Sequence, residues 1–417
     1  MIYSRISSKS LIGFILIFAV FGLLGATALH AYQTRYVIVV IIDGVRYTES
    51  LGDATGTYCP RLTALSHQGV VLDSAFNDSV TVTAWGVPAL WMGRWYELQD
   101  TTYLGNQIRF CRYPTAWEYA RHDLLLPSGK AIDITPDYSS SKWRSSFYPG
   151  YGPDYWPVFV QPPISDNNNQ GVFDSAVVVL QRNHPVITYI YLPDTDHAGH
   201  SGVRADYIAK IRQADSLTVA LWDIIQTDTA MAGKTAMFVT NDHGRHDDAH
   251  GGFRNHGDGC FGCRHVMLLA VGPDFKQDTH LDSLHSSIID IAKTAGELLG
   301  FDPIYSPGRI LHELFIQNSC SYVSGDINGD HLRGGGDVTY GVRFFKQIGN
   351  RPPDSCYMDS TSSYLYVAGD VNGNCEFRGS DITRLVAYFK GYMPLSYCHF
   401  FPPLPMRESR KAPALRD

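Results

Sequence analysis

The chain has 417 residues, a formal net charge of −7, and 44% hydrophobic against 18% charged residues. This is enough apolar material for a large core and excludes a wholly disordered chain. The mild acidity argues against a nucleic-acid-binding protein, because such proteins normally present a basic face. The length favours two or three domains.

The N-terminal residues 1–31 are typical of a secretory signal peptide. Arg5 and Lys9 precede an apolar run over residues 11–24, and an Ala-x-Ala cleavage site begins at Ala26. The run is short for a membrane-spanning helix; an uncleaved anchor is the alternative interpretation. We therefore expect a bacterial protein that is secreted, periplasmic or at the cell surface, with no membrane segment after cleavage.

Three β-branched or aromatic runs predict strands in a first domain over residues 32–318. They cover residues 36–42, 186–192 and 235–240. Continuous apolar runs of this length are typical of buried strands in a parallel sheet.

Helices are predicted between and after these strands. Residues 207–225 carry apolar side chains at helical spacing, and residues 286–299 predict a further helix. Residues 139–169, rich in Ser, Pro, Gly, Tyr and Asn, predict a long irregular insertion. The alternation predicts an α/β fold, with a mostly parallel sheet flanked by helices.

Carboxylates and histidines follow the carboxyl ends of all three predicted strands. Sites in open α/β sheets lie beyond these ends, so we expect the side chains to converge. The candidate metal ligands are Asp43, Asp196, His200, Asp242, His243 and His256. Six ligands are more than one four-coordinate ion needs, which predicts two zinc or manganese ions and suits phosphoryl chemistry. Each residue alone could be an ordinary turn or cap residue, so the prediction rests on their joint occurrence.

A candidate nucleophile lies after the first strand. Residues 87–92 predict a short helix that ends at Gly93, and Thr81 and Thr83 precede it. A hydroxyl at a helix N-terminus gains from the backbone amides and the helix dipole, which also favour a bound anion. Either threonine could be a simple helix cap, whereas a neighbouring metal ion would make one of them a nucleophile. Asn77, nearby in the sequence, is a candidate for binding a substrate oxygen.

Taken in linear order, these motifs resemble the alkaline phosphatase superfamily, and within it the nucleotide pyrophosphatase/phosphodiesterase branch. The motifs are Asp43-Gly44, the segment 83–93, Asp196-His-Ala-Gly-His200, Asp242-His243-Gly244 and His256-Gly257. The resemblance implies that Asp43, Thr83, Asp242 and His243 hold one zinc ion, and that Asp196, His200 and His256 hold the other. It also implies that Thr83 is the nucleophile of a covalent phospho-enzyme. His250-Gly251 fits the last motif as well, and His256 is preferred because a strand follows it.

The sequence departs from the family in two places. Ala84-Trp85-Gly86 follows Thr83 where the phosphodiesterases have Phe-Pro-Asn, and no Cys-x-Pro-x-Arg or Ser-x-Pro-x-Arg motif of the sulfatases is present. The resemblance therefore implies an exported two-metal hydrolase of phosphate esters. Sulfate or phosphonate ester hydrolysis, phospho-group transfer, or a non-catalytic cell-surface binding role are the alternatives.

The cysteines divide into two sets. In an exported chain we expect Cys260 and Cys263 to form a local disulfide, with a zinc knuckle completed by His256 and His265 as the alternative, and Cys59 to pair with Cys111. The later Cys320, Cys356, Cys375 and Cys398 predict two disulfides whose pairing the sequence leaves open.

A repeat dominates residues 319–398. Two copies of Gly-Asp-x-Asn-Gly stand 44 residues apart, at Gly325 and Gly369, and each precedes an aromatic helix. Oxygen side chains occupy positions 1, 3, 5 and 12, the pattern of a calcium loop. They are Asp326, Asn328, Asp330 and Asp337 in the first copy and Asp370, Asn372, Asn374 and Asp381 in the second.

The repeat resembles the dockerin module of bacterial extracellular proteins, a duplicated half EF-hand. This implies calcium binding and a cohesin-like or cell-surface protein partner. Position 9 departs from the pattern, with Gly334 in the first loop and Arg378 in the second. A turn repeat without a bound ion is the alternative. The remaining residues 399–417 predict a disordered tail.

Overall fold

The computed structural model describes residues 32–136, 142–283, 285–316, 322–353, 356–358, 363–398 and 400–401. The predicted signal peptide and nearly all of the predicted C-terminal tail lie outside these residues. None of the helices in the described ranges is long and apolar enough to cross a membrane.

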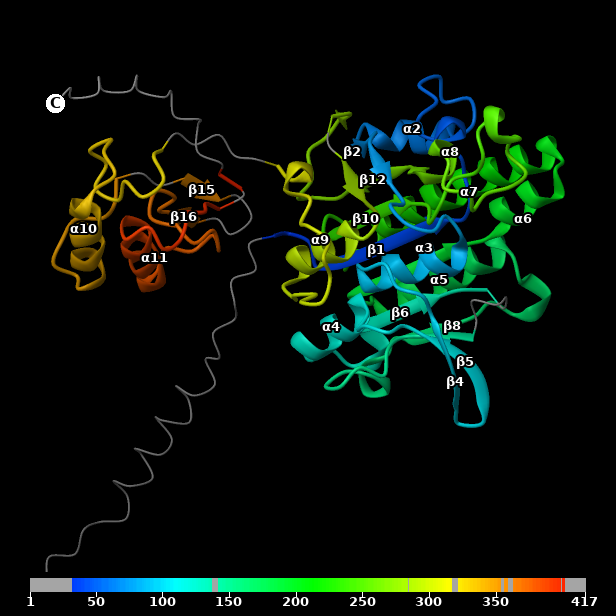
Figure 1. Cartoon of the computed structure of the whole chain (residues 1–417), viewed down its shortest axis with the longest axis horizontal. Coiled ribbons are helices and arrows are strands. Elements are labelled where there is room, and N and C mark those ends of the chain that lie inside the picture. The colour runs from blue at the N-terminus through cyan, green and yellow to red at the C-terminus, as the bar shows by residue number, and fades with distance from the viewer. Residues whose placement is uncertain are drawn as a thin grey trace, which may run out of the picture.

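An eight-stranded sheet forms the centre of the larger body (Figure 1), in the order β13-β2-β12-β10-β1-β9-β6-β8. Its strands are β1 (Tyr36–Ile42), β2 (Gly69–Leu72), β6 (Ala131–Ile134), β8 (Val158–Val160), β9 (Ile187–Leu192), β10 (Thr235–Thr240), β12 (Leu268–Val271) and β13 (Thr279–Leu281). β10, β1, β9, β6 and β8 run parallel, and β12 is antiparallel to both of its neighbours. The predicted mostly parallel sheet is confirmed.

Alternate side chains of β1 enter two separate cores, which is why this strand is apolar throughout. Val37, Val39 and Ile41 pack into one buried cluster, whereas Ile38 and Val40 pack into the other. A strand with helices on both faces needs apolar residues at every position.

Helices cover both faces of the sheet. They are α2 (Pro60–Ser66), α3 (Thr83–Met92), α4 (Ala116–Asp123), α5 (Asn169–Asn183), α6 (Asp194–Ser201), α7 (Arg204–Thr227), α8 (Phe261–Arg264) and α9 (Asp290–Leu299). Buried side chains of α3, α4 and α9 belong to the first core, and those of α2, α5 and α7 to the second. The chain therefore forms the three-layer arrangement that the sequence predicts.

Two small sheets border the main one. One consists of β3 (Ala75–Phe76), β11 (His265–Val266) and β14 (Ser286–Ser287), and the other of β4 (Gln99–Tyr103), β5 (Asn106–Phe110) and β7 (Trp143–Arg144).

Three predicted boundaries need correction. The helix expected from residue 286 begins at Asp290, because Ser286–Ser287 pairs with β3 instead. The nucleophile helix begins at Thr83, earlier than residue 87. The predicted irregular insertion over 139–169 contains β7 and also β8. β8 is an edge strand of the main sheet.

The C-terminal repeat forms a small lobe beside the larger body (Figure 1). It contains α10 (Gly335–Phe345), α11 (Gly379–Phe389) and the hairpin of β15 (Cys356–Met358) with β16 (Ser363–Leu365). The repeat is visible in its core, where Ile327 and Val371, at matching positions of the two loops, pack with Ile382 and Leu385 of α11.

The disulfides agree with the predictions only in this lobe. Cys375 and Cys398 form a disulfide, and Cys356 is disulfide-bonded as well. Cys59 and Cys111 are free, buried thiols, so the predicted bond between them is wrong. Each is enclosed by a different packed region, since Cys59 belongs to the second core and Cys111 to the first.

Candidate metal centre and nucleophile

Three neighbouring strands deliver the predicted ligands to one edge of the sheet. β1 lies between β10 and β9, and all three run parallel, so their carboxyl ends meet. Asp43 follows β1, Asp242 and His243 follow β10, and α6 places Asp196 just beyond β9. The convergence that the sequence predicts is present.

The first ligand group is fully enclosed. Asp43, Asp242 and His243 each offer a ligand atom within 4.8 Å of the others. His243 Nε2 lies 3.5 Å from Asp43 Oδ1 and 3.4 Å from Asp242 Oδ2. Both of these carboxylate oxygens are buried and have no hydrogen-bond partner among the described residues. Buried oxygens without partners are costly unless a cation neutralises them.

The electrostatics of this group show the same cost. Burial, together with the charges of Asp242 and Asp196, raises the pKa of Asp43 well above its usual range. Burial also raises the pKa of Asp242 to about 7, helped by the charge of Asp196. Two adjacent carboxylates in a dry site repel each other, so a bound divalent cation would restore their ordinary ionised state.

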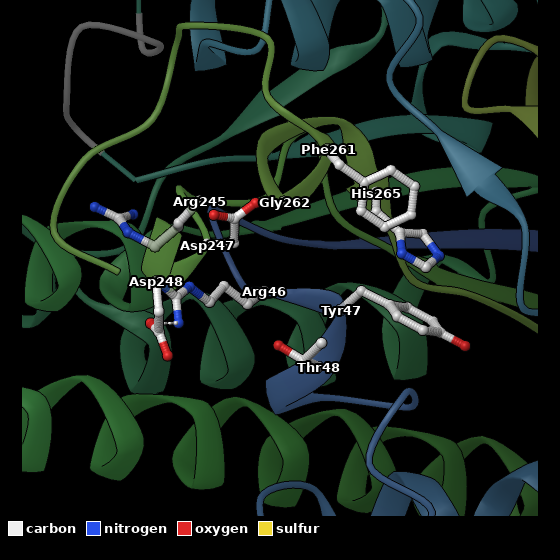
Figure 2. Close-up of a pocket in the computed structure, with 9 residues that line it drawn as sticks. All are labelled: Arg46, Tyr47, Thr48, Arg245, Asp247, Asp248, Phe261, Gly262 and His265. Carbon is white, nitrogen blue, oxygen red and sulfur yellow. Dashed lines mark hydrogen bonds and ion pairs between the residues drawn. The ribbon is translucent and has the colours of Figure 1, made fainter. Parts of the chain in front are cut away.

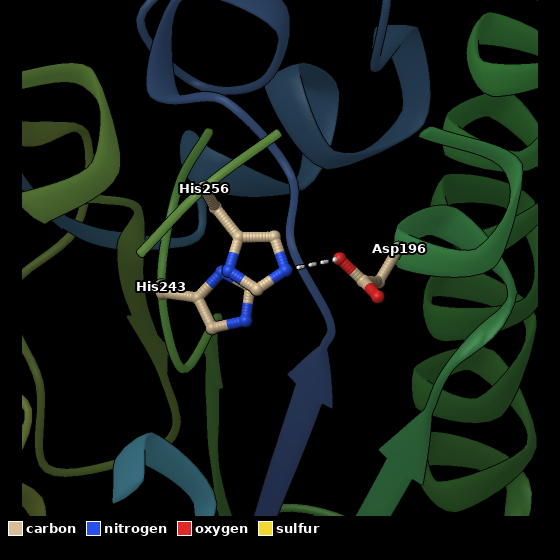
Figure 3. A group of neighbouring side chains, drawn as sticks. All are labelled: Asp196, His243 and His256. Carbon is tan, nitrogen blue, oxygen red and sulfur yellow. Dashed lines mark ion pairs between the residues drawn. The ribbon is translucent and has the colours of Figure 1, made fainter. Parts of the chain in front are cut away.

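The second ligand group lies against the first. Figure 3 shows Asp196, His243 and His256 pointing toward one another. His256 Nε2 lies 3.4 Å from Asp196 Oδ1, and the half-exposed His200 contributes Nε2 at 3.2 Å from Asp196 Oδ2 and 3.0 Å from His256 Nε2. The structure thus brings together the three residues that the resemblance assigns to the second ion.

Hydrogen bonds to the backbone fix the orientation of two histidines. His256 Nδ1 lies 2.9 Å from the Thr81 carbonyl oxygen, and His243 Nδ1 lies 2.9 Å from the Gly244 carbonyl oxygen. Each carbonyl accepts from Nδ1–H, which leaves the lone pair of Nε2 facing the carboxylates. Metal-binding histidines commonly have such supporting bonds.

His250 takes no part in this arrangement. Its side chain is half exposed, and Nδ1 lies 2.7 Å from Asp247 Oδ1 on its own loop. Of the two histidines that fit the last motif, the structure brings only His256 to the ligand groups.

Thr83 is the first residue of α3, and its Oγ1 lies 3.2 Å from His243 Nε2. The helix packs closely on the strand end at Gly86, where a Cβ would lie 2.5 Å from the Asp242 carbonyl oxygen. The departure from the family at Ala84-Trp85-Gly86 therefore has a steric role in this chain. Thr81 is buried, and its Oγ1 has no hydrogen-bond partner among the described residues.

A cavity of about 390 Å³ opens in front of these groups. Its walls are Asp43, Val82, Thr83, Ala84, Trp143, Tyr191, Asp196, His197, His200 and His256. Trp143 lies in β7, within the segment 139–169 that the sequence predicts as an irregular insertion.

Asn77 is placed differently from the prediction. Its side chain is buried, Nδ2 donates to the Asp242 carbonyl oxygen at 2.7 Å, and Oδ1 accepts from the Ser79 N–H at 2.9 Å. Both polar atoms are thus occupied by the backbone, and Asn77 is not among the residues that line the cavity. Asn77 therefore supports the strand end.

Sequence reasoning missed two residues of the site. The Tyr191 hydroxyl donates to Asp43 Oδ2, although its strand predicts only a core residue. The Arg245 guanidinium pairs with Asp196 Oδ1 and is completely buried. A basic residue directly after Asp242-His243-Gly244 was the one available signal for Arg245.

The pKa of Asp196 reflects this pairing. Burial alone would raise it, but the hydrogen bond from His200 and the positive charge of the Arg245 guanidinium hold the pKa of Asp196 well below its usual range.

No family model matches the sequence, and no curated protein matches it. Solved structures do. A 2-O GAG sulfatase aligns with a TM-score of 0.51 at 13% identity, covering 67% of this chain and 73% of that one. A putative sulfatase from Bacteroides thetaiotaomicron gives 0.51 at 13% identity, covering 67% and 74%. A murine ectonucleotide pyrophosphatase/phosphodiesterase gives 0.49 at 13% identity, covering 66% and 97%.

The chain has an alkaline phosphatase-like fold. Its structural neighbours are hydrolases of that superfamily. The matches cover 66–67% of the chain, and the predicted dockerin-like identity of the C-terminal repeat has no support from these comparisons.

Proposed function

We propose that the protein is a two-metal hydrolase that cleaves phosphate diesters with Thr83 as its nucleophile. The observation that carries the proposal is the convergence of three carboxylates, three histidines and one threonine hydroxyl at the ends of three adjacent strands. Such a set on this fold supports hydrolysis over a simple binding role, because a site that had lost its activity would usually have lost some of these groups.

The residues fit two divalent cations. Asp43, Asp242, His243 and Thr83 would hold one, and Asp196, His200 and His256 the other. The unpartnered oxygens Asp43 Oδ1 and Asp242 Oδ2 independently support a cation-binding role for this group. Zinc or manganese would supply positive charge that lowers the pKa of the attacking hydroxyl and stabilises the charge developing on the phosphoryl group.

The chain itself positions the reacting atoms. The Thr83 hydroxyl faces the first ligand group from the N-terminus of α3, so the N–H groups of the first turn point toward a phosphoryl group bound there. Tyr191 fixes Asp43, and the backbone carbonyls of Thr81 and Gly244 fix His256 and His243. This leaves little reorganisation for the reaction itself.

A diester fits the cavity better than a monoester. None of the ten described residues that line it is lysine or arginine. The nearby Arg245 is engaged by Asp196 and by the carbonyl oxygens of Phe253 and Arg254. The second ionised oxygen of a monoester would find no cationic side chain, whereas Val82 and Trp143 offer an apolar wall to a second ester group.

Sulfate or phosphonate ester hydrolysis is the second candidate, because the two structural neighbours with a TM-score of 0.51 are described as sulfatases. The threonine at position 83 opposes it, since sulfatases of this superfamily carry Cys or Ser in a motif that this sequence lacks. Comparing kcat/KM on p-nitrophenyl sulfate, phenylphosphonate, phosphate and bis-p-nitrophenyl phosphate separates the candidates, and we expect the diester to react fastest.

Thr83→Ala tests the nucleophile. We expect turnover of the best ester to fall at least about a thousand-fold, while elemental analysis still finds the metal of the wild type. Thr83→Ser should retain measurable turnover because it keeps the hydroxyl. Full activity in Thr83→Ala would contradict the assignment.

We propose two further properties from the sequence. The N-terminal segment would export the protein, which N-terminal sequencing of the mature protein would test. The duplicated loops would bind calcium and present the lobe to a protein partner. In support, both loops fold around their first and last carboxylates in the same way: Asp326 and Asp370 each accept from the N–H groups three and five residues later.

A further inference from the structure

A second cluster of metal-binding side chains lies outside the catalytic cavity. His246, Asp258 and Cys263 place their ligand atoms within 4.8 Å of one another. Cys260 contacts Cys263 and also belongs to a neighbouring group with Asp247 and His250. None of these residues lines the cavity around Thr83.

The polar atoms of this cluster point at a common centre. Asp258 Oδ1 accepts from the Cys260 N–H at 2.9 Å, and Oδ2 lies 3.2 Å from His246 Nε2. That imidazole nitrogen is buried and has no hydrogen-bond partner among the described residues. Asp258 also contacts both thiols, and the two thiols contact each other. Three donor groups of the types that zinc prefers thus face one another, and the Cys260 thiol, in contact with Asp258 and Cys263, is a fourth within reach.

Local backbone geometry builds the cluster. Cys260 precedes the short helix α8 and Cys263 lies within it, so a tight turn carries both thiols on one side, with the Cys263 N–H bonded to the Cys260 carbonyl at 3.0 Å. Two glycines bring this turn against the segment that carries His246. A Cβ on Gly244 would lie 2.0 Å from the Gly262 carbonyl oxygen, and one on Gly262 would lie 2.9 Å from the Asp247 nitrogen.

Figure 2 shows the same close approach from the other side, where Asp247 and Gly262 lie next to each other in the wall of a neighbouring cavity. This packing allows residues from two separate turns to bind one metal ion. Structural zinc sites join loops in this way.

We propose that Cys260, Cys263, His246 and Asp258 bind a structural zinc ion. Both cysteines are free thiols in the structure, so the local disulfide that the sequence predicts is absent. Two thiolates, an imidazole and a carboxylate make a closed four-coordinate set for zinc, and binding would release the two thiol protons. His250 is excluded from the set because it is paired with Asp247 at the surface.

The proposed zinc site would join the two ends of the loop that carries His256. His246 stands at the beginning of this loop and Asp258 near its end, two residues beyond His256. A zinc ion between them would hold His256 toward Asp196 even before the catalytic ions bind.

Cobalt substitution of the full chain tests the site without any substrate. Thiolate ligands give cobalt(II) an intense near-ultraviolet charge-transfer absorption that the oxygen and nitrogen ligands of the catalytic centre cannot give. We expect this absorption in the wild type, its loss in the double variant Cys260→Ser/Cys263→Ser, and its retention in Cys59→Ser, which removes a buried thiol elsewhere. Asp43→Asn should retain it too, so the result does not depend on the hydrolase proposal.

A wild-type measurement covers the case in which the double variant fails to fold. In native zinc-loaded protein, Cys260 and Cys263 should resist alkylation and become reactive once a strong chelator removes zinc, as peptide mass spectrometry would show. Absence of the charge-transfer absorption, its persistence in the double variant, unchanged alkylation after chelation, or a Cys260–Cys263 disulfide in the exported protein would each overturn the proposal.

Discussion

The strand-end site and the duplicated C-terminal loops both gather carboxylates, but they hold them in different ways. Asp43 and Asp242 each keep one buried oxygen without a hydrogen bond among the described residues. In the repeat, Asp337 Oδ1 accepts from the N–H groups of Ile327 and Asn328, and its Oδ2 accepts from that of Gly334. A bound cation would offset the charge of the first region, whereas the second is held by its own backbone.

Asp242→Asn should separate the two effects of a ligand carboxylate. With metal present, we expect activity to fall at least about a hundred-fold, because an amide is a poor metal ligand. In the metal-free protein, the same change should raise the free energy of unfolding by about 1–3 kcal/mol, because it removes one of two repelling buried charges.

Urea unfolding with and without a chelator measures both effects. Asn77→Ala serves as the comparison, since it removes a support of the same strand end without changing its charge. A metal-free Asp242→Asn protein that is less stable than the wild type would contradict our account of the unpartnered oxygens.

Asp133 sharpens the comparison, because it is a buried carboxylate outside any candidate metal group. It lies in β6, and neither oxygen has a hydrogen-bond partner among the described residues. Burial raises its pKa to about 8, although the charge of Arg144 lowers it somewhat. The folded protein therefore keeps a proton that the unfolded chain loses near its usual value of 3.8, and stability falls as the pH rises across this interval.

We expect Asp133→Asn to raise the free energy of unfolding by about 3 kcal/mol at pH 9 and to have little effect below pH 4. Urea unfolding across this pH range measures the difference. Asp215→Asn is the matched control: burial raises the pKa of Asp215 as well, but its carboxylate accepts from the N–H groups of Arg61 and Leu62, so the amide should bring a smaller gain at pH 9. A pH-independent effect at position 133 would contradict the raised pKa.

The strand-end ligands were predictable for a physical reason. β1, β9 and β10 are six or seven residues long and apolar on both faces, so their ends are visible in the sequence, and polar residues that follow them must meet at one edge. β2, β6 and β12 have only four residues each. In such short segments the spacing of apolar residues does not distinguish a strand from a turn of buried helix.

Contacts between distant segments were not predictable. Tyr191 and Arg245 reach the site through pairings that depend on the three-dimensional placement of two strand ends. The hydrogen bond from Asn77 to the Asp242 carbonyl oxygen was not predictable, because closeness in sequence to Thr83 does not show which backbone groups the amide will contact. Cys59 and Cys111 remain free thiols because they lie in the two cores on opposite faces of the sheet. Their spacing in the sequence does not reveal this separation.

Asp337→Asn tests the C-terminal loops, whose carboxylates are held by backbone N–H groups. The amide has only one accepting oxygen and cannot accept from all three N–H groups. We therefore expect a loss of about 1–2 kcal/mol of unfolding free energy even without calcium. Asp330→Asn should cost less without calcium, because Asp330 makes fewer backbone bonds, with Oδ1 accepting from the Leu332 N–H. Both variants should weaken the stabilisation that calcium gives the wild type.

Thermal unfolding of the full chain with calcium or chelator distinguishes the two parts of this prediction. Unchanged stability of calcium-free Asp337→Asn would contradict the hydrogen-bond account. A wild type that calcium does not stabilise would instead contradict the calcium proposal and leave the loops as turns held by their own carboxylates.

The smallest expected effect concerns Arg378, at position 9 of the second loop. Its Nε lies 2.6 Å from Glu376 Oε2, so the guanidinium neutralises an acid next to the proposed calcium position. Arg378→Ser should strengthen calcium binding at this loop about threefold, since exposed charge pairs contribute well below 1 kcal/mol. Gly334→Ser is the matched change in the first loop. Nothing lies within 4 Å of a Cβ added there, and the change removes no charge.

Calorimetric calcium titration should therefore find the calcium affinity of the first loop unchanged and that of the second loop increased. Equal responses in the two loops would mean that charge does not set their affinities.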